Sequence, residues 1–380
     1  MPRAERPATP EACAELLRAC ADGHRTVRVR GGGTKDHLGT RAETDVVLET
    51  GGLDGIVDHV PEDLTVTVRA GMAFAALRDA LARHGQLLPL DPPHVARGAT
   101  VGGIIAANSN GFGRFRYGSV RDLLLGVRAA LPDGTIARAG GRVVKNVAGY
   151  DLNKLFIGSF GTLGVVVEAT FKILPLPPVT RAAEATFATA GDAFGAADAI
   201  VRTSLRPTAL VVERTDDHRW RLIVAAAGEA APVDRAMREL ARVAGSARPI
   251  DDPHAALGPL REIVDRAAAG IVVRAALPLS AQAAFAEASA HADRGAHVVA
   301  DAASGIANVH LREDSAGLVA AADALIANAR VLGGSARIER SAVPGIDASG
   351  AEPAGAFLMR RLKDAFDPNG ILEPARSVLW

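Results

Sequence analysis

Three clusters of glycine between residues 31 and 164 restrict the fold of this chain more than any other feature of its sequence. The first cluster, Arg30-Gly31-Gly32-Gly33-Thr34, directly follows the strand-like run Val27 to Arg30. Residues without a Cβ let backbone N–H groups converge on an anion, and the Thr34 hydroxyl adds a donor. The pattern is neither a Walker loop nor a glycine-rich turn that opens a helix. Taken alone, it fits a diphosphate-binding loop and an ordinary turn equally well.

The second cluster joins a proline-rich loop to a long run of small residues between positions 88 and 118. A large flat ligand can lie against such a wall, because backbone approaches a ligand closely only where side chains are small. Close helix packing would explain the glycines and alanines but not the adjoining prolines, so a ligand is favoured. The residues concerned are Pro89, Leu90, Asp91, Pro92, Thr100, Val101, Gly102, Gly103, Asn108, Tyr117 and Gly118.

The third cluster runs from Gly158 to Gly164 and leads into the apolar run Val165-Val166-Val167. A Gly-Thr-Leu-Gly turn before a strand fits a loop whose backbone holds the edge of a nucleotide. Lys145 and Asp151, just before it, fit an ordinary surface pair equally well.

The glycine clusters belong to the first of three predicted regions. Residues 1–177 alternate strand-like runs (27–30, 45–49, 64–70, 123–131 and 163–174) with loops and a helix that starts near Phe74. Prolines at 175, 177 and 178 indicate a linker. Residues 178–345 alternate strands and helices in a second α+β domain with no evident internal repeat. Residues 346–380 form a tail, with a helix over 356–365, that is expected to return to the first domain.

Composition excludes several classes of function. The 43 basic residues balance 43 acidic ones, and a nucleic-acid partner would favour a basic excess. No apolar run approaches the roughly twenty residues of a membrane span, and no signal peptide is evident, so a cytoplasmic location is expected. Thr9 and Pro10 mark the start of a helix in which Cys13 and Cys20 share one face, which favours core thiols over a metal or redox site.

In this order and spacing, the clusters resemble the FAD-binding domain of the p-cresol methylhydroxylase superfamily. Within it, the strings PLDPP, ATVGGIIAAN, RYGSVRDLLLGVR, KNVAGYDLNKLF and GTLGVVVEATFK are similar to the E-type, FAD-binding subunits of bacterial glycolate oxidases. The resemblance implies an α+β fold: a two-subdomain FAD-binding domain and a ferredoxin-like α+β cap domain. Some members attach FAD covalently through a histidine where this chain has Thr34, so the FAD is expected to be non-covalent.

The resemblance also implies roles for the glycine clusters. Gly31, Gly32, Gly33 and Thr34 would hold the pyrophosphate. Residues Pro89 to Pro92 and Thr100 to Gly103 would line the pyrophosphate and flavin, and Asn108 belongs to the same wall. Tyr117, Gly118, Gly164, Val165 and Val166 would contact the rest of the cofactor.

The chain departs from the catalytic members at the motifs that bind metal and substrate. Their His-x-x-Asp-Gly-Asn-x-His pattern corresponds to Ala303 through His310, where only Asn308 and His310 remain. The later Glu-His-Gly reads Glu339-Arg340-Ser341, so no metal site is expected. His310 and Tyr150 are weak candidates for a base, since a core or surface histidine is the commoner case. Arg340 is a weak candidate for pairing with a carboxylate.

The leading hypothesis is therefore an FAD-dependent oxidoreductase subunit of a heteromeric glycolate oxidase complex, which supports the oxidation of glycolate to glyoxylate. Its expected partners are a larger subunit that carries FAD and metal and an iron–sulfur subunit, because two cysteines cannot hold a cluster. Such partners could place it peripherally at the inner membrane. The alternatives are a self-sufficient FAD-linked oxidase of another 2-hydroxy acid or alcohol, and an assembly subunit without catalysis.

Overall fold

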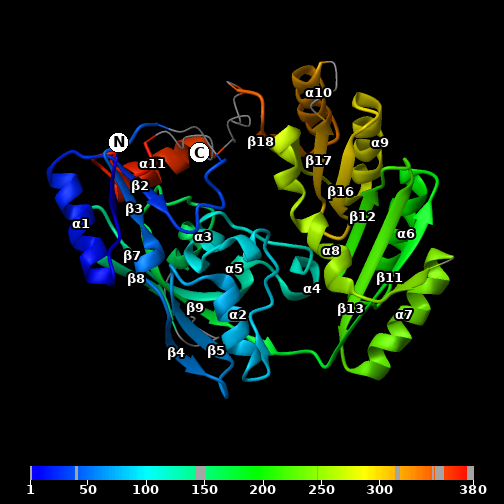
Figure 1. Cartoon of the computed structure of the whole chain (residues 1–380), viewed down its shortest axis with the longest axis horizontal. Coiled ribbons are helices and arrows are strands. Elements are labelled where there is room, and N and C mark those ends of the chain that lie inside the picture. Colours follow the sequence, from blue (N-terminus) through cyan, green and yellow to red (C-terminus); the bar gives the residue numbers. More distant parts are fainter. Residues whose placement is uncertain are drawn as a thin grey trace. The chain divides into compact units, whose positions relative to one another are not determined.

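The computed structural model describes residues 2–38, 42–141, 151–245, 247–312, 317–344, 346 and 355–374. The chain divides into two compact units (Figure 1). The first unit comprises residues 1–110, 118–176 and 351–380, and the second comprises residues 111–117 and 177–350. The main division falls after Leu176, inside the proline-rich linker. Residues 111–117 belong to the second unit, whereas the sequence predicted them in the first domain.

The first unit contains three sheets. A parallel sheet has the order β1-β3-β2, an antiparallel sheet has the order β4-β5-β9-β7-β8, and β10 pairs with β6. The strands are β1 (Arg3–Glu5), β2 (Val27–Arg30), β3 (Val46–Glu49), β4 (Ile56–Val60), β5 (Thr65–Arg69), β6 (Gln86–Leu87), β7 (Leu124–Ala130), β8 (Ile136–Gly140), β9 (Val165–Lys172) and β10 (Leu174–Pro175). The helices are α1 (Pro10–Asp22), α2 (Phe74–Ala82), α3 (Val101–Ala106), α5 (Val120–Leu123) and α11 (Ala356–Phe366).

Strand β9 lies in the core of the first unit, and its first three residues pack on both of its faces. Val165 and Val167 pack in one cluster with Leu17 of α1, while Val166 packs in another cluster with Leu77 of α2. Every residue of β9 except Lys172 is buried. Because β9 is packed on both faces, it fixes the position of the end of the preceding loop, residues 158–164.

The C-terminal segment returns to the first unit. Leu372 forms a parallel bridge with Val27, and the Val27 amide donates to the Ile371 carbonyl at 2.8 Å. The Phe366 ring lies edge-to-face against Phe156, with centroids 6.1 Å apart. Residues from the far end of the described sequence therefore complete the structure around β2.

The second unit contains one eight-stranded antiparallel sheet with the order β14-β11-β13-β12-β16-β17-β15-β18 (Figure 1). Its strands are β11 (Val179–Phe187), β12 (Ala209–Arg214), β13 (Trp220–Gly228), β14 (Arg248–Ile250), β15 (Gly270–Ala276), β16 (His297–Asp301), β17 (Ile306–Arg312) and β18 (Ser335–Ser341). Its helices are α4 (Arg114–Tyr117), α6 (Ala190–Val201), α7 (Ala230–Ala244), α8 (Pro253–Arg261), α9 (Gln282–Ala292) and α10 (Leu318–Val331).

This sheet is a repeat of one motif. The elements β11-α6-β12-β13-α7-β14 and β15-α9-β16-β17-α10-β18 each follow the β-α-β-β-α-β order of ferredoxin-like folds. The halves join edge to edge through β12 and β16. The sequence predicted one ferredoxin-like domain without a repeat. The topology repeats although the sequence does not, because each half needs only the same alternation of strands and helices.

The two faces of the sheet differ. Residues of α6, α7, α9 and α10 form one large apolar core with the first face. On the other face, α8 and the following 3₁₀ turn (Ile263–Ala269) cover an apolar patch that includes Val211, Val272 and Val299.

Candidate functional site

A cavity of about 80 Å³ lies within the first unit, where three loops converge. Its walls come from the turn after β2, from α3 and the residue before it, and from the loop that leads into β9. The lining residues are Val29, Arg30, Gly31, Gly32, Gly33, Thr34, Lys35, Asp36, Thr50, Thr100, Gly102, Gly103, Ala106, Ala107, Ser159, Phe160, Gly161, Gly164, Val165 and Val166. A cavity that holds one water molecule has a volume of roughly 10–15 Å³, so this cavity has room for a small polyatomic group.

The turn after β2 fits tightly against the segment before α3. A Cβ added to Gly31 would lie 2.4 Å from the Thr100 hydroxyl oxygen, and one added to Gly32 would lie 1.9 Å from the Gly98 carbonyl oxygen. Any larger residue would therefore force these two walls apart. Within the described residues, the amides of Gly31, Gly32 and Gly33 donate no hydrogen bond to protein. These amides fit a group that offers several acceptor oxygens, as a diphosphate does.

The start of α3 contributes shape rather than donors. Thr100 caps the helix by accepting from the Gly103 amide at 3.2 Å, and the Val101 and Gly102 amides donate to Met72 and Ala70. These early helix amides are thus already used. A Cβ on Gly102 would lie 2.9 Å from the Ala70 Cβ, so Gly102 also serves close packing.

The third wall is a loop with unusual backbone geometry. Phe160 has φ +52°, and Gly161 has φ +80°, a conformation that glycine adopts without strain. The Phe160 amide donates to the Ala106 carbonyl at 2.9 Å, which ties this loop to α3. The Ser159 hydroxyl donates to Phe156, and the Thr162 hydroxyl donates to Ser159. The loop is therefore fixed by its own hydrogen bonds.

The C-terminal segment holds two of these walls. The Lys363 ammonium donates to the Thr162 carbonyl at 2.9 Å and to the Leu372 carbonyl at 2.8 Å, and it pairs with the buried Asp367 carboxylate at 2.5 Å. Glu373 accepts from the Val29 amide at 2.7 Å, immediately before the glycine turn. Lys363 and Glu373 thus connect the loop before β9 to the end of β2.

The cavity has cations at its rim. Arg30 and Lys35 line it together with one acid, Asp36. The Arg30 guanidinium pairs with Asp36 at 3.0 Å and lies 3.9 Å from Glu49. The neutral overall charge of the chain is compatible with an anionic ligand here, because backbone amides and these rim cations supply the local positive potential.

The structure gathers many of the predicted cofactor residues around this cavity and leaves others elsewhere. Those that line it are Gly31, Gly32, Gly33, Thr34, Thr100, Gly102, Gly103, Gly164, Val165 and Val166. Val101 and Leu90 are buried in the apolar core, and Pro89, Asp91, Pro92, Asn108 and Gly118 belong to the first unit but do not line it. Tyr117 belongs to the second unit. Ser159, Phe160 and Gly161 also line the cavity; they lie inside the third glycine cluster but were not predicted as site residues.

The three weak catalytic candidates are not gathered at the cavity. Tyr150 lies outside the described residues. His310 hydrogen-bonds through Nε2 to the Ala269 carbonyl at 3.1 Å, and burial lowers the pKa of its imidazole. Arg340 donates to Asp265 at 2.9 Å. His310 and Arg340 therefore each have a protein partner within the second unit.

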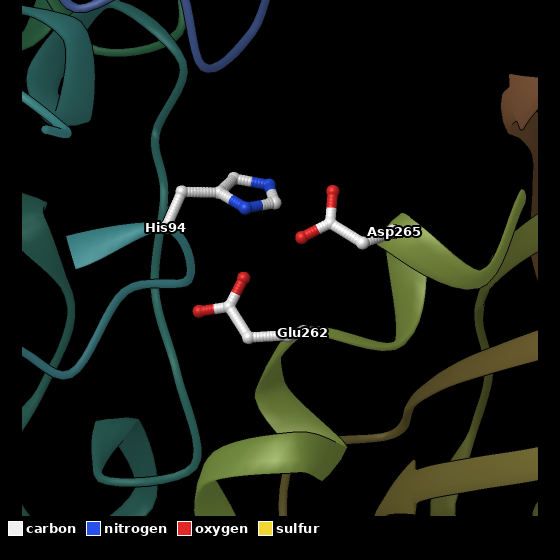
Figure 2. A group of neighbouring side chains, drawn as sticks. All are labelled: His94, Glu262 and Asp265. Atoms are coloured by element: carbon white, nitrogen blue, oxygen red, sulfur yellow. The ribbon is translucent and has the colours of Figure 1, made fainter. Parts of the chain in front are cut away.

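Figure 2 labels His94, Glu262 and Asp265. His94 belongs to the first unit, whereas Glu262 and Asp265 come from the turn after α8 in the second. The three residues are therefore not a site of either unit. Asp265 is the partner of Arg340 described above.

Residues 3–140 match the protein family described as FAD binding domain. The glycolate oxidase subunit GlcE of Escherichia coli K12 is 43% identical over 149 residues, which are 39% of this chain and 42% of that protein. The mitochondrial D-lactate dehydrogenase (cytochrome) 1 of Saccharomyces cerevisiae is 34% identical over 221 residues, 57% of this chain and 37% of that protein. The glycolate oxidase subunit GlcD of Bacillus subtilis is 33% identical over 205 residues, 54% of this chain and 43% of that protein. The matched part spans less than half of each relative.

The fold is also found in solved structures. An alkyldihydroxyacetonephosphate synthase has a TM-score of 0.78 and covers 98% of this chain and 75% of its own, at 17% identity. This similarity concerns the fold alone. Together with the family match, it confirms the predicted FAD-binding fold of the p-cresol methylhydroxylase type. In the described part of the chain, no helix combines the length and apolar character needed to cross a membrane.

Proposed function

We propose that this chain is the FAD-binding subunit of a complex that oxidises glycolate to glyoxylate, since residues 3–140 match the FAD binding domain family. The observation that carries the proposal is the cavity of the first unit, whose glycine turn offers unused amides beside Arg30 and Lys35. The similarity to GlcE, at 43% identity over 149 residues, supports glycolate as the substrate. More broadly, the similarity to D-lactate dehydrogenases supports oxidation of a 2-hydroxy acid.

In this proposal, the amides of Gly31, Gly32 and Gly33 hold the diphosphate of non-covalent FAD, and Thr34 and Lys35 lie beside it. Bound FAD supplies a two-electron acceptor for oxidation of an alcohol carbon. Phe160, Gly161 and Gly164 shape the opposite wall through their backbone. Lys363 and Glu373 keep the two walls together, so they are positioning residues rather than ligand contacts.

A partner-dependent role is supported by what the second unit lacks in its described residues. The catalytic relatives' metal and base motifs are replaced here, and the Nε2–H group of the remaining His310 donates to the Ala269 carbonyl. Arg340 is paired with Asp265. We therefore assign removal of the substrate proton to a larger subunit that carries FAD and metal, and onward electron transfer to an iron–sulfur subunit.

The test is to purify the chain alone and together with such partners, and to follow the flavin absorbance under anaerobic addition of glycolate. The chain alone is expected to bind FAD reversibly and to keep it oxidised; the complex is expected to show glycolate-dependent bleaching. A chain that binds no flavin after incubation with FAD would contradict the cofactor assignment. Bleaching of the isolated chain at the rate of the complex would contradict the partner-dependent role.

The second candidate is a self-sufficient D-2-hydroxy-acid dehydrogenase, favoured by the 34% identity to a D-lactate dehydrogenase over 221 residues. Rapid mixing of the isolated, FAD-loaded chain with D-lactate, glycolate and D-2-hydroxyglutarate separates the two. Reduction by D-lactate without partners supports this candidate, and its absence with all three acids supports the complex.

A further inference from the structure

Two histidines of the first unit lie in contact near the end of helix α2. His59 is on β4, directly opposite Val66 of β5, and His84 follows the last residues of α2. Both histidines belong to the first unit, so their contact lies inside one compact part of the chain. The centres of the two rings are 4.9 Å apart, and the ring planes meet at 89°. The fold thus brings together two imidazoles that are distant in the sequence.

Hydrogen bonds hold the backbone on both sides of this pair. The His84 amide donates to the Leu81 carbonyl at 2.9 Å, and Gly85 ends the helix with a left-handed φ of +65°. The Gly85 carbonyl accepts from the Leu176 amide at 2.7 Å. His59 is held in the ladder between β4 and β5. Because both backbones are fixed, the fold sets the spacing of the two side chains.

Gln86 determines which nitrogen of His59 carries the proton. The side-chain nitrogen of Gln86 donates to the Pro61 carbonyl at 2.9 Å, so the Oε1 atom is the one that faces His59. This oxygen lies 2.8 Å from His59 Nε2. An amide oxygen only accepts, so Nε2 carries a hydrogen and Nδ1 of the neutral ring keeps its lone pair. Gln86 is only 7% exposed, which protects this arrangement from water.

The other ring nitrogens of the pair are available to a ligand. Among the described residues, none forms a hydrogen bond with His59 Nδ1 or with either nitrogen of His84. His59 is half-buried and His84 is exposed, so a ligand can reach the pair from solvent. A histidine that donates one N–H group to a carbonyl oxygen and keeps its other nitrogen unprotonated is typical of a metal ligand. His59, Gln86 and Pro61 form such an arrangement.

The distance between the rings suits two ligands of one metal ion. An ion lies roughly 2.0–2.1 Å from an imidazole nitrogen, and therefore about 3.2 Å from the ring centre. Angles of about 90–110° between the two ligands then place the ring centres roughly 4.5–5.2 Å apart. The observed 4.9 Å lies within this range. An exposed side chain changes rotamer within nanoseconds, so His84 can turn one nitrogen toward an ion at His59 Nδ1.

We propose that His59 and His84 bind one divalent transition-metal ion, and that Gln86 positions His59 for it. Neutral imidazole suits Cu²⁺, Ni²⁺ and Zn²⁺, whereas Mg²⁺ prefers oxygen ligands. Water completes the coordination, and the bound ion connects β4 to the end of α2 and stabilises the first unit. Neither histidine lines the cavity assigned to FAD, so the inference does not depend on the proposed function.

The first test is isothermal titration of the untagged full chain with Cu²⁺, Ni²⁺, Zn²⁺ and Mg²⁺. The wild type should bind Cu²⁺ more tightly than Ni²⁺ or Zn²⁺, and Mg²⁺ should not compete. His84→Gln changes an exposed side chain, and it should lose one equivalent of Ni²⁺ or bind it at least about tenfold more weakly. The matched control is His291→Gln, which removes an exposed imidazole of α9 and should leave binding unchanged.

Two variants of Gln86 test its positioning role. Gln86→Leu removes the acceptor of the His59 Nε2–H group and should weaken Ni²⁺ binding by about tenfold to a hundredfold, as expected when such a partner is lost. Gln86→Glu keeps an acceptor and should bind Ni²⁺ more tightly than Gln86→Leu. Equal affinities of these two variants would show that Gln86 does not position His59.

Electron paramagnetic resonance of bound Cu²⁺ counts the nitrogen ligands and does not depend on stability. The wild type should show two nitrogen ligands at this ion, and His84→Gln should show one. Saturating Zn²⁺ should raise the midpoint of thermal unfolding of the wild type more than that of His84→Gln. Equal metal binding by the wild type and His84→Gln, or identical Cu²⁺ spectra of the two, would overturn the site. Neither result would affect the FAD assignment, which the flavin titration tests separately.

Discussion

Replacement of Gly32 by alanine should weaken FAD binding, because the glycine turn has no room for a methyl group. The added Cβ would lie 1.9 Å from the Gly98 carbonyl oxygen and 2.8 Å from the carbonyl carbon, whereas Cβ contacts under 3.0 Å are essentially never observed. Both of these Gly98 atoms belong to the backbone, so no side-chain rotation can relieve the contact. Either the glycine turn or the segment before α3 must therefore move by about 1 Å to bring the contact from 1.9 Å to 3.0 Å.

The magnitude follows from the cost of overpacking, which is about 1–3 kcal/mol. If the strain is relieved by moving the Gly31 to Gly33 amides, the same free energy is lost from binding, and the dissociation constant of FAD rises by roughly fivefold to 150-fold. If the chain resists that movement, the strain is instead seen as a lower free energy of unfolding. We therefore predict that the loss of FAD-binding free energy and the loss of unfolding free energy together amount to about 1–3 kcal/mol.

The assay is equilibrium titration of the apoprotein with FAD, followed by flavin fluorescence, together with chemical denaturation. The matched control is Gly195→Ala in helix α6, where an added Cβ meets nothing within 4 Å. That change should raise the free energy of unfolding by about 0.5–1 kcal/mol, as expected for alanine in a helix, and leave FAD binding unchanged. Unaltered FAD affinity and unaltered stability in Gly32→Ala would refute the reasoning.

Three further predictions concern buried groups. Lys363→Met leaves the Asp367 carboxylate buried without its cation, so the free energy of unfolding measured in urea should fall by about 3 kcal/mol and FAD binding should weaken. An unchanged unfolding transition would show that the Lys363–Asp367 pair does not hold the two walls of the cavity together. Burial raises the pKa of the Cys13 thiol to about 12, so alkylation at pH 8 should be negligible until the chain unfolds, which mass spectrometry measures; rapid labelling of the native chain would contradict this. Burial acts to raise the pKa of Glu213, but the hydrogen bond with His297 and the charge of Arg221 hold it below its ordinary value. The wild-type chain should therefore be more stable than Glu213→Gln above the ordinary carboxyl pKa, and lose that advantage as pH falls through the lowered pKa; a pH-independent difference in denaturation would oppose it.

Local patterns predicted the parts of the site that depend on neighbouring residues in the sequence. Gly31, Gly32 and Gly33 were identified because they directly follow a strand, and the observed amides are free of protein acceptors in the described residues. The helix start was likewise predicted, since the Thr9 hydroxyl accepts from the Ala12 amide and Pro10 follows it. Such features involve residues only a few positions apart.

Contacts that depend on strand register could not be predicted in this way. Arg340 was selected because it follows Glu339 in the motif, but its guanidinium is paired with Asp265, 75 residues away. Arg274 faces Asn308 only because β15 and β17 pair in one particular register. A shift of that register by one residue would send one of these side chains to the opposite face. Composition also does not indicate that residues 111–117 belong to the second unit, although the residues on either side of them belong to the first.

The return of the C-terminal segment to β2 has a consequence for biosynthesis. The Val29 amide and the Glu373 carboxylate that joins it are 344 residues apart, and the second unit is almost entirely encoded between them. During translation, residues 177–350 can leave the ribosome and form their sheet while β2 and its glycine turn still lack this partner. Cofactor loading should then be a late, post-translational event, and a released fragment that ends at residue 350 should contain a folded second unit beside an FAD site that is not assembled.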